Sequence, residues 1–299
     1  MIELALIGPT ASGKSDLALK IAQKIDAYIL SIDSLSIYKE IDIVSAKPSH
    51  EELSQIKHFG INELYADEYF SVEILIQIYK NAKKECEKNS KNLVIVGGTS
   101  FYLKSLIDGL STLPDITQNA KDIVDKKLQD LQSCYTCLYD LDPKYMQNIN
   151  KNDRYRIEKA LLIYEASNVT PSEWFAKNPP KPIIENLQIF NIEVEREVLR
   201  ERINVRTKKM ADMGLVDEVA FLEQKYTREP NAMGAIGIVE VLDYLDGKIS
   251  KDEMIELIAT HTAQLAKRQQ TFNRTQFENI TSAKLEDLEG IILHKVLHT

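Results

Sequence analysis

The sequence lacks long apolar runs and contains few cysteines. No apolar stretch reaches the length of about 18 residues that a membrane-spanning helix needs. The N-terminal segment MIELALIGPT has neither the basic region nor the cleavage site of a secretory signal. We therefore expect a cytoplasmic protein that does not enter a membrane. Its 299 residues fit one large domain or two smaller ones.

The three cysteines argue against a structural metal site. Cys134 and Cys137 form a single CxxC motif, and Cys86 lies apart from it. A structural zinc site needs four ligands, often from two such pairs, and no second CxxC is present. The pattern favours unlinked thiols.

Basic residues are outnumbered, with 37 Lys and Arg against 45 Asp and Glu, and the net charge is −8. This balance argues against a strong nonspecific affinity for nucleic acids, although one basic face is enough to bind RNA. The best candidate for such a face contains Arg196, Arg200, Arg202, Arg206, Lys208 and Lys209. A solvated helix surface is the alternative interpretation of these charges.

Short apolar segments alternate with segments of helical periodicity. The predicted strands are 2–7, 27–33, 92–100 and 187–195. The predicted helices around them are 15–25 and 71–89, and later 196–213, 215–225, 236–246 and 250–273. This alternation predicts an α/β fold, with a parallel sheet flanked by helices.

The middle of the chain differs from the two ends. Residues 114–185 show helical patterns, such as 156–167, and close with the proline-rich NPPKP. We therefore predict a core from residues 1–113, an inserted helical domain at 114–185, and a second part of the core at 186–299 that ends in helices.

The segment GPTASGKS at residues 8–15 matches GxxxxGK[ST], the phosphate-binding loop or P-loop. A predicted strand before it and a predicted helix after it are the context that this motif requires. Backbone N–H groups, the Lys14 ammonium and a Mg²⁺ ion on the Ser15 hydroxyl would together hold phosphates. The predicted phosphate-binding residues are Gly8, Pro9, Thr10, Ala11, Ser12, Gly13, Lys14 and Ser15. The motif is typical of nucleotide- and ATP-binding proteins.

The acid that usually accompanies a P-loop is missing from its common position. It ends a neighbouring strand in many such proteins, but the strand at 92–100 ends in Gly97-Gly98-Thr99. Asp33, after the second predicted strand, is the available carboxylate, and parallel strands would place it near the P-loop. A turn or helix-capping residue is the alternative interpretation of Asp33.

The motifs together resemble the bacterial tRNA dimethylallyltransferases, also called tRNA isopentenyltransferases. The blocks that carry the resemblance are GPTASGKS (8–15), IDSLSIYKEIDIVSAKP (32–48), VGGTSFYLKSLIDGL (96–110), NDRYRIEKALLIYEAS (152–167), LRERINVRTKKMADMGLVDEV (199–219), AIG (235–237) and THTAQLAKRQQTFNR (260–274). The resemblance implies transfer of a dimethylallyl group from dimethylallyl diphosphate to N6 of the adenosine next to the anticodon, on its 3′ side.

The resemblance also implies roles for individual residues. The P-loop, Arg202 and Arg206 would bind the diphosphate, with Mg²⁺ as cofactor, so the loop would hold a leaving group. Asp33 would be the general base, and Lys14, Thr10 and Arg206 would complete the catalytic set. The implied tRNA contacts are Asp33, Ser34, Leu35, Ser36, Thr99, Lys121, Tyr155, Arg156, Ile157, Glu158 and Lys159.

The implied partners are dimethylallyl diphosphate and the anticodon stem-loop of tRNA, and we expect a monomer. Ser36 stands where the family usually has Gln. After Ala235-Ile236-Gly237 the family commonly continues with Tyr and a basic residue, where this chain has Ile238 and Val239. Both departures predict altered tRNA contacts. A P-loop small-molecule or nucleotide kinase is the alternative, although it leaves Arg202 and Arg206 without a role. A non-catalytic RNA-binding module is a second alternative.

Overall fold

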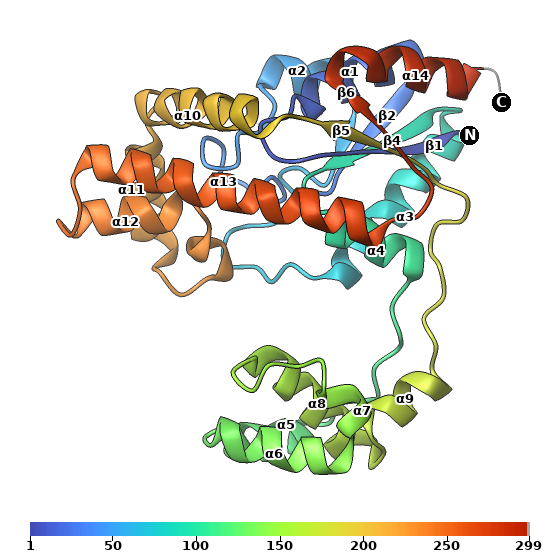
Figure 1. Cartoon of the computed structure of the whole chain (residues 1–299), viewed down its shortest axis with the longest axis vertical. Helices are drawn as coiled ribbons and strands as arrows, with labels where there is room; N and C mark the ends of the chain where they lie inside the picture. The colour runs from blue at the N-terminus through green and yellow to red at the C-terminus, as the bar shows by residue number, and fades with distance from the viewer. Residues whose placement is uncertain (298–299) are drawn as a thin grey trace. The chain divides into compact units, whose positions relative to one another are not determined.

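The computed structural model describes residues 1–297 (Figure 1). The chain forms two compact units, one from Met1–Ile107 with Ile184–Thr299 and the other from Asp108–Ile183. The second unit is therefore inserted into the first, and it begins before the predicted bound of residue 114. Each unit buries an apolar cluster of its own.

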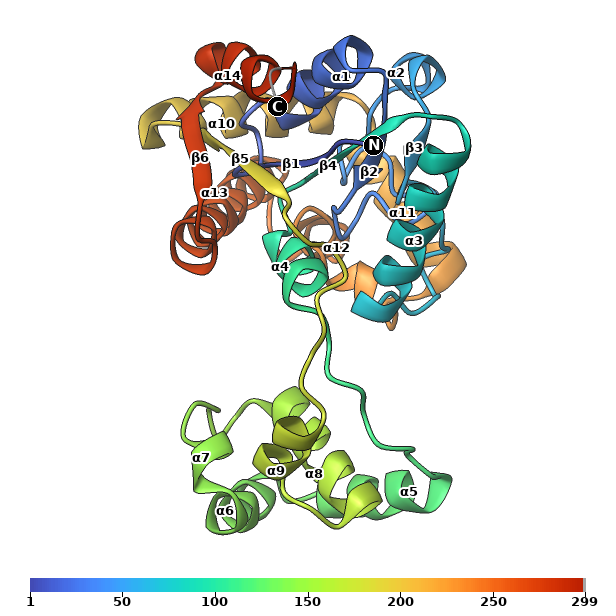
Figure 2. The ribbon, with the colours of Figure 1, turned by 90° about the vertical axis from the view of Figure 1, so that its right-hand side faces the viewer.

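The first unit is built on one parallel six-stranded sheet in the order β3-β2-β4-β1-β5-β6 (Figure 2). The strands are β1 (Glu3–Ile7), β2 (Ala27–Ser31), β3 (His58–Phe59), β4 (Asn92–Gly97), β5 (Gln188–Glu193) and β6 (Ile280–Lys284). In the centre of the sheet, Ala5 of β1 lies opposite Ile95 of β4 and Ile189 of β5. The sheet and its flanking helices confirm the predicted α/β class.

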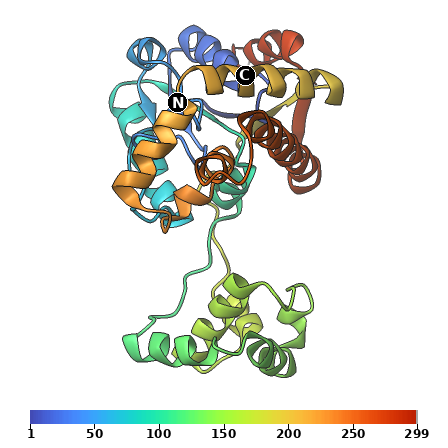
Figure 3. The ribbon, with the colours of Figure 1, turned by 90° about the vertical axis from the view of Figure 1, so that its left-hand side faces the viewer.

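The helices of this unit are α1 (Lys14–Lys24), α2 (His50–Gln55), α3 (Val72–Lys88), α4 (Ser100–Asp108), α10 (Arg196–Asp212), α11 (Leu215–Tyr226), α12 (Ile238–Leu245), α13 (Lys251–Gln276) and α14 (Leu285–Leu297), with a 3₁₀ turn η1 (Asn231–Gly234). Figure 3 shows α10 to α13 in gold to orange-red. The predicted helix after the P-loop corresponds to α1, and the last four predicted helices correspond to α10 to α13.

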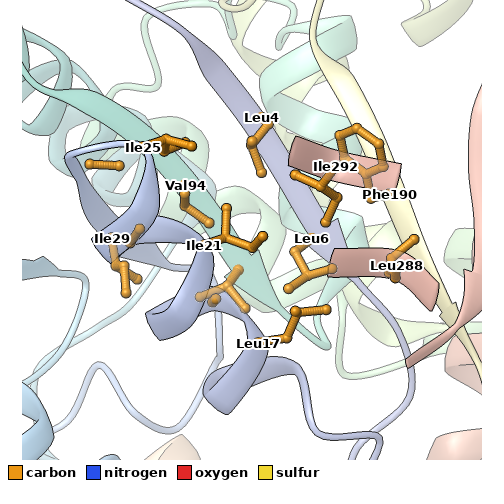
Figure 4. Close-up of a cluster of buried hydrophobic side chains, with 14 of the residues drawn as sticks. Leu4, Leu6, Leu17, Ile21, Ile25, Ile29, Val94, Phe190, Leu288 and Ile292 are labelled. Atoms are coloured by element: carbon orange, nitrogen blue, oxygen red, sulfur yellow. The ribbon is translucent and has the colours of Figure 1, made fainter. Parts of the chain in front are cut away.

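Helices α1 and α14 cover one face of the sheet. Leu17 and Ile21 stand one turn apart on α1 and point toward Leu6 of β1, while Leu288 and Ile292 of α14 join the same cluster (Figure 4). Side chains one helical turn apart on α1 therefore pack against side chains two residues apart on β1. Burial of each such side chain contributes about 1.5–3 kcal/mol.

Helix α3 covers the opposite face of the sheet. It contacts β2 and β4, and its Tyr79 hydroxyl donates a hydrogen bond to Glu3 Oε1 at 2.8 Å. Glu3 points away from the face that Leu4 and Leu6 present to α1, since successive side chains on a strand alternate. Both faces of the sheet are therefore covered by helices, which explains its apolar strands.

The prediction of a mostly helical C-terminal region missed β6. The sequence ITSAK carries one large apolar residue, Ile280, and the strand is only partly buried because it forms the edge of the sheet. Its pairing with β5 comes from contacts distant in the chain. Local periodicity therefore gave no signal for it.

The second unit is entirely helical, with α5 (Gln118–Lys127), α6 (Leu131–Leu141), α7 (Pro143–Met146), α8 (Arg154–Ser167) and α9 (Pro171–Lys177). A side-chain oxygen caps the N-terminus of each, from Thr117, Asp130, Asp142, Asp153 and Thr170. Such caps satisfy orphan backbone N–H groups and contribute about 0.5–2 kcal/mol each. The core is built around α8, which contacts α5, α6 and α9.

All three cysteines are free thiols, and Cys134 packs in the core of the second unit. Among residues 1–297, no group of three His, Cys, Asp or Glu side chains is placed to hold a metal ion. No helix in this same range is long and apolar enough to cross a bilayer.

Candidate active site

A pocket of about 650 Å³ lies in the first unit, at the carboxyl ends of the central strands. The P-loop follows β1, Asp33 follows β2, and Gly98 follows β4, which lies between them. Parallel strands bring these ends to one edge of the sheet, where α/β proteins bind ligands. Six predicted site residues line the pocket together: Thr10, Asp33, Ser34, Leu35, Thr99 and Arg206.

The P-loop curls because its glycines accept unusual backbone angles. Gly13 caps α1 with φ at 91°, a left-handed conformation that favours glycine. Inside the loop, the Lys14 ammonium donates a hydrogen bond to the Pro9 carbonyl at 2.6 Å, and the Ser12 N–H donates to the same oxygen at 3.3 Å. The loop is therefore already closed around the Lys14 side chain.

Two arginines of α10 reach the P-loop from one helix face. Arg206 Nη1 donates to the Thr10 hydroxyl at 3.4 Å, and Arg202 Nη1 donates to the Ser12 carbonyl at 3.4 Å. The two arginines are four residues apart, so one helical turn aims both in the same direction. Arg202 is exposed and does not line the pocket, whereas Arg206 is half-buried in its wall.

Burial shifts the titration of the cationic groups at the site. It lowers the pKa of the Lys14 ammonium to about 8, with a further lowering by the Arg206 charge and an opposing rise from Asp33. Burial also lowers the pKa of Arg206, and Asp33 again opposes the shift. Removing these cations from water is costly, which favours binding of an anion beside them.

Asp33 forms a turn and also faces the pocket. Its Oδ1 accepts hydrogen bonds from the N–H groups of Leu35 at 2.9 Å and Ser36 at 3.1 Å. Within residues 1–297, its Oδ2 has no hydrogen-bond partner. Asp33 can therefore close the turn through Oδ1 and still offer Oδ2 to a ligand, so its two interpretations are compatible.

Ser36 does not join the other residues of its segment. It is 5% exposed and is absent from the pocket lining, while Ser34 and Leu35 are half-buried in that lining. The turn that Asp33 closes directs Ser36 inward. Its side chain therefore has little surface to offer to a ligand.

The remaining predicted tRNA contacts lie in the second unit. Lys121 of α5 is exposed, and so are Tyr155 and Arg156 of α8, Tyr155 by 63%. The Lys159 ammonium lies 5.5 Å above the centre of the Tyr155 ring. Ile157 is 0% exposed and belongs to the apolar core of this unit. Residue 157 faces inward on α8, so its side chain offers no surface for the predicted tRNA contact.

Glu158 lies beside these residues on α8 and is half-buried. On α12 of the first unit, Val239 is exposed, whereas the preceding Ile238 is fully buried. The departure at Val239 therefore changes a surface residue rather than a core contact.

An aromatic wall of the pocket was not predicted. Phe70 and Tyr102 meet edge to face with ring centres 5.2 Å apart, and Tyr38 and Phe101 extend the row. The loop before α3 supplies Phe70, which has no motif around it. Tyr38, Phe101 and Tyr102 lie in the blocks 32–48 and 96–110. The apolar residues of these blocks were the only sequence signal for an apolar pocket wall.

Helix α13 also contributes residues that sequence reasoning missed. Arg268 and Gln269 line the pocket, and Gln269 Oε1 accepts a hydrogen bond from the Thr10 N–H at 2.8 Å. Both residues lie in the block 260–274. The contact of Gln269 with the P-loop depends on the packing of α13 and has no local sequence signal.

Comparisons with known proteins show which family this chain belongs to. A family model described as IPP transferase matches residues 36–276. A tRNA dimethylallyltransferase from Sulfurimonas denitrificans is 67% identical over 98% of this chain and 99% of its own length. The chain belongs to the tRNA dimethylallyltransferase family. This confirms the resemblance seen in the sequence.

Other members of the tRNA dimethylallyltransferase family match over comparable lengths. The enzyme from Sulfurovum sp. is 54% identical, with 97% of each chain covered. The crystal structure of the full-length tRNA isopentenylpyrophosphate transferase from Bacillus halodurans superposes with a TM-score of 0.72 at 27% identity, covering 99% of this chain and 96% of that one. The similarity thus includes the inserted helical unit as well as the core.

Proposed function

We propose that this chain transfers the dimethylallyl group of dimethylallyl diphosphate to N6 of the adenosine on the 3′ side of the tRNA anticodon, and releases diphosphate. The observation that carries the proposal is the meeting of Thr10, Arg206 and Asp33 in one pocket. Two of these residues belong to a phosphate-binding surface, and the third is a carboxylate able to accept a proton. Membership of the family supports the same assignment.

The donor would bind through its diphosphate. The P-loop N–H groups, Lys14, Arg202 and Arg206 form a cationic surface around the loop. The allylic C–O bond breaks as negative charge grows on the diphosphate, so cations and N–H donors placed there stabilise the transition state. In this proposal the P-loop binds a leaving group and has no need of ATP.

Ser15 fits a role as the protein ligand of Mg²⁺. It is exposed in the first turn of α1, directly after Lys14. Mg²⁺ prefers oxygen donors and commonly takes only one or two from the protein, with water and substrate phosphates completing its shell. When bound, the ion would neutralise charge on the diphosphate. Among residues 1–297 no group of three His, Cys, Asp or Glu side chains is placed to hold a metal ion, so the proposed site would use few ligands from the protein.

Asp33 would accept the proton from the adenine amine. As the new C–N6 bond forms and the allylic C–O bond breaks, N6 loses a proton, for which Asp33 Oδ2 is the acceptor in the pocket. General bases act within hydrogen-bond reach of about 3 Å. The adenine would leave its stack to enter the pocket, as bases do in other enzymes that modify them.

Each unit would supply tRNA contacts of its own. Ser34, Leu35 and Thr99 line the pocket beside Asp33, where the flipped adenosine would lie. On the second unit, Lys121, Arg156 and Lys159 offer cations to the phosphates of the anticodon stem-loop, and the exposed Tyr155 ring offers a stacking surface. We further propose that the protein acts as a monomer in the cytoplasm, where tRNA is available.

Mass analysis of tRNA nucleosides tests the proposal. Unmodified tRNA is incubated with the purified protein, MgCl₂ and dimethylallyl diphosphate, and the digest is searched for dimethylallyl-adenosine. A parallel thermal-shift experiment compares dimethylallyl diphosphate with ATP. Stabilisation by ATP alone, with no modified nucleoside, would instead support the P-loop kinase.

A further inference from the structure

Gln269 connects the P-loop to a helix from the far end of the chain. Its Oε1 accepts a hydrogen bond from the Thr10 N–H at 2.8 Å, across 259 positions of sequence. Gln269 is half-buried in α13 and lines the same pocket as Thr10 and Arg206. The P-loop is therefore held from outside its own strand and helix.

The other end of the Gln269 amide packs against Gly98. A Cβ atom added to Gly98 would lie only 2.5 Å from Gln269 Nε2, which is closer than real contacts allow. Gly98 follows β4, between the ends of β1 and β2. The missing side chain at Gly98 thus leaves the space in which Gln269 reaches Thr10.

Thr10 in turn contacts the cation that faces the proposed leaving group. Its hydroxyl accepts a hydrogen bond from Arg206 Nη1 at 3.4 Å. Gln269 therefore holds the backbone of a residue whose side chain holds Arg206. A shift of the Thr10 backbone would move both the hydroxyl and the guanidinium.

We propose that Gln269 is a positioning residue for the leaving-group site, and that Gly98 provides the room for it. This inference rests on the proposed transferase function. The Thr10 N–H is already engaged by Gln269, so the diphosphate would bind through other loop N–H groups and Lys14. Loss of Gln269 therefore lowers turnover more than it lowers donor affinity.

The first test replaces the glutamine. Gln269→Ala removes the acceptor for the Thr10 N–H and is expected to lower kcat about 10- to 100-fold, because displacements of about 1 Å at a reacting centre have effects of this size. The KM for dimethylallyl diphosphate is expected to change by less than about threefold, since uniform binding is retained. Gln264→Ala is the matched control, because Gln264 is exposed on the same helix and does not line the pocket.

The second test displaces the glutamine without changing it. The three atoms nearest to a Cβ placed on Gly98 all belong to the end of the Gln269 side chain, so Gly98→Ala is expected to fold while Gln269 moves away. We expect a loss of kcat similar to that of Gln269→Ala. In the double variant Gln269→Ala removes the side chain with which the added methyl group would clash. The loss of kcat is therefore expected to equal that of Gln269→Ala alone. Melting temperatures of all variants verify folding.

The outcomes separate this inference from the proposed function. A wild-type protein that transfers no dimethylallyl group would refute the function itself. With an active wild type, unchanged kcat in both single variants would overturn the positioning role. A double variant whose loss equals the product of the single losses would overturn it too, because independent sites multiply their effects on rate.

Discussion

Arg206 Nη1 donates a hydrogen bond to the Thr10 hydroxyl at 3.4 Å, although the two residues are 196 positions apart. The contact places a half-buried guanidinium against the P-loop, at the pocket that Asp33 also lines. The proposed phosphate site and the proposed proton acceptor thus share one cavity. The predictions below test the parts of this arrangement separately.

Replacement of Arg206 tests the leaving-group site. Arg206→Ala is expected to lower kcat/KM about 100- to 1,000-fold, the usual effect of removing one donor to a developing anion. Arg206→Lys keeps the charge but loses the planar donor fork, so we expect only partial recovery. Steady-state kinetics with Arg200→Ala, an exposed arginine on the same helix, provides the control. Equal activity of Arg206→Ala and Arg200→Ala would contradict the assignment.

Replacement of Asp33 tests the general base. Asp33→Asn keeps a side-chain oxygen for the N–H groups of Leu35 and Ser36, so the turn and the melting temperature should be retained. The amide is a poor proton acceptor, and kcat is expected to fall about 100- to 10,000-fold. Donor affinity, measured by calorimetry, is expected to stay close to wild type. Near-normal turnover would rule out Asp33 as the base.

The pKa of Lys14 predicts a pH dependence of donor binding. Bound diphosphate stabilises the ammonium form, so the pKa of Lys14 rises in the complex above its free value of about 8. Affinity is then constant below pH 8 and weakens above it, by at most about tenfold per pH unit for one proton. Titration calorimetry from pH 6.5 to 9.5 measures this. A flat profile in the wild type, matching that of Lys14→Met, would exclude the coupling.

Replacement of Glu218 tests how its carboxylate stabilises the backbone at 42–44, beside the pocket. Its Oε2 accepts hydrogen bonds from the N–H groups of Asp42 at 3.0 Å and Ile43 at 2.7 Å, and its Oε1 accepts one from Val44 at 3.0 Å. Glu218→Ala leaves these donors without their carboxylate and is expected to lower the free energy of unfolding by about 1–3 kcal/mol. Asp217→Ala, at an exposed neighbour on α11, should change it little. Denaturant titration compares the two.

Replacements of Ile157 and Tyr155 are expected to have different effects: the first on the stability of the second unit, the second on tRNA binding. Ile157→Ala removes a fully buried side chain and should destabilise this unit by about 2–5 kcal/mol. Tyr155→Ala changes an exposed ring and should weaken tRNA binding while leaving the melting curve unchanged. Neither should alter affinity for dimethylallyl diphosphate. Loss of tRNA binding in Ile157→Ala without destabilisation would restore a direct contact at residue 157.

Elements with a local signal could be predicted closely from the sequence. The strand predicted at 2–7 is β1 (Glu3–Ile7), and the helix predicted at 15–25 is α1 (Lys14–Lys24). The spacing of apolar residues and the glycines of the P-loop determine structure over only a few neighbouring residues. A strand and a helix of this kind can therefore be predicted from the sequence. β6 was missed because an edge strand needs no apolar run, only the neighbouring strand β5 to pair with.

The sequence by itself determined that this protein has a P-loop and belongs to a particular family, since these depend on which residues follow one another. Only the tertiary structure decided which of them meet. The parallel order of β2, β4 and β1 brings Asp33 to the pocket of the P-loop, and the packing of α10 and α13 brings Arg206 and Gln269 to Thr10. These contacts join residues up to 259 positions apart. They arise from burial of the core, which local sequence patterns do not encode.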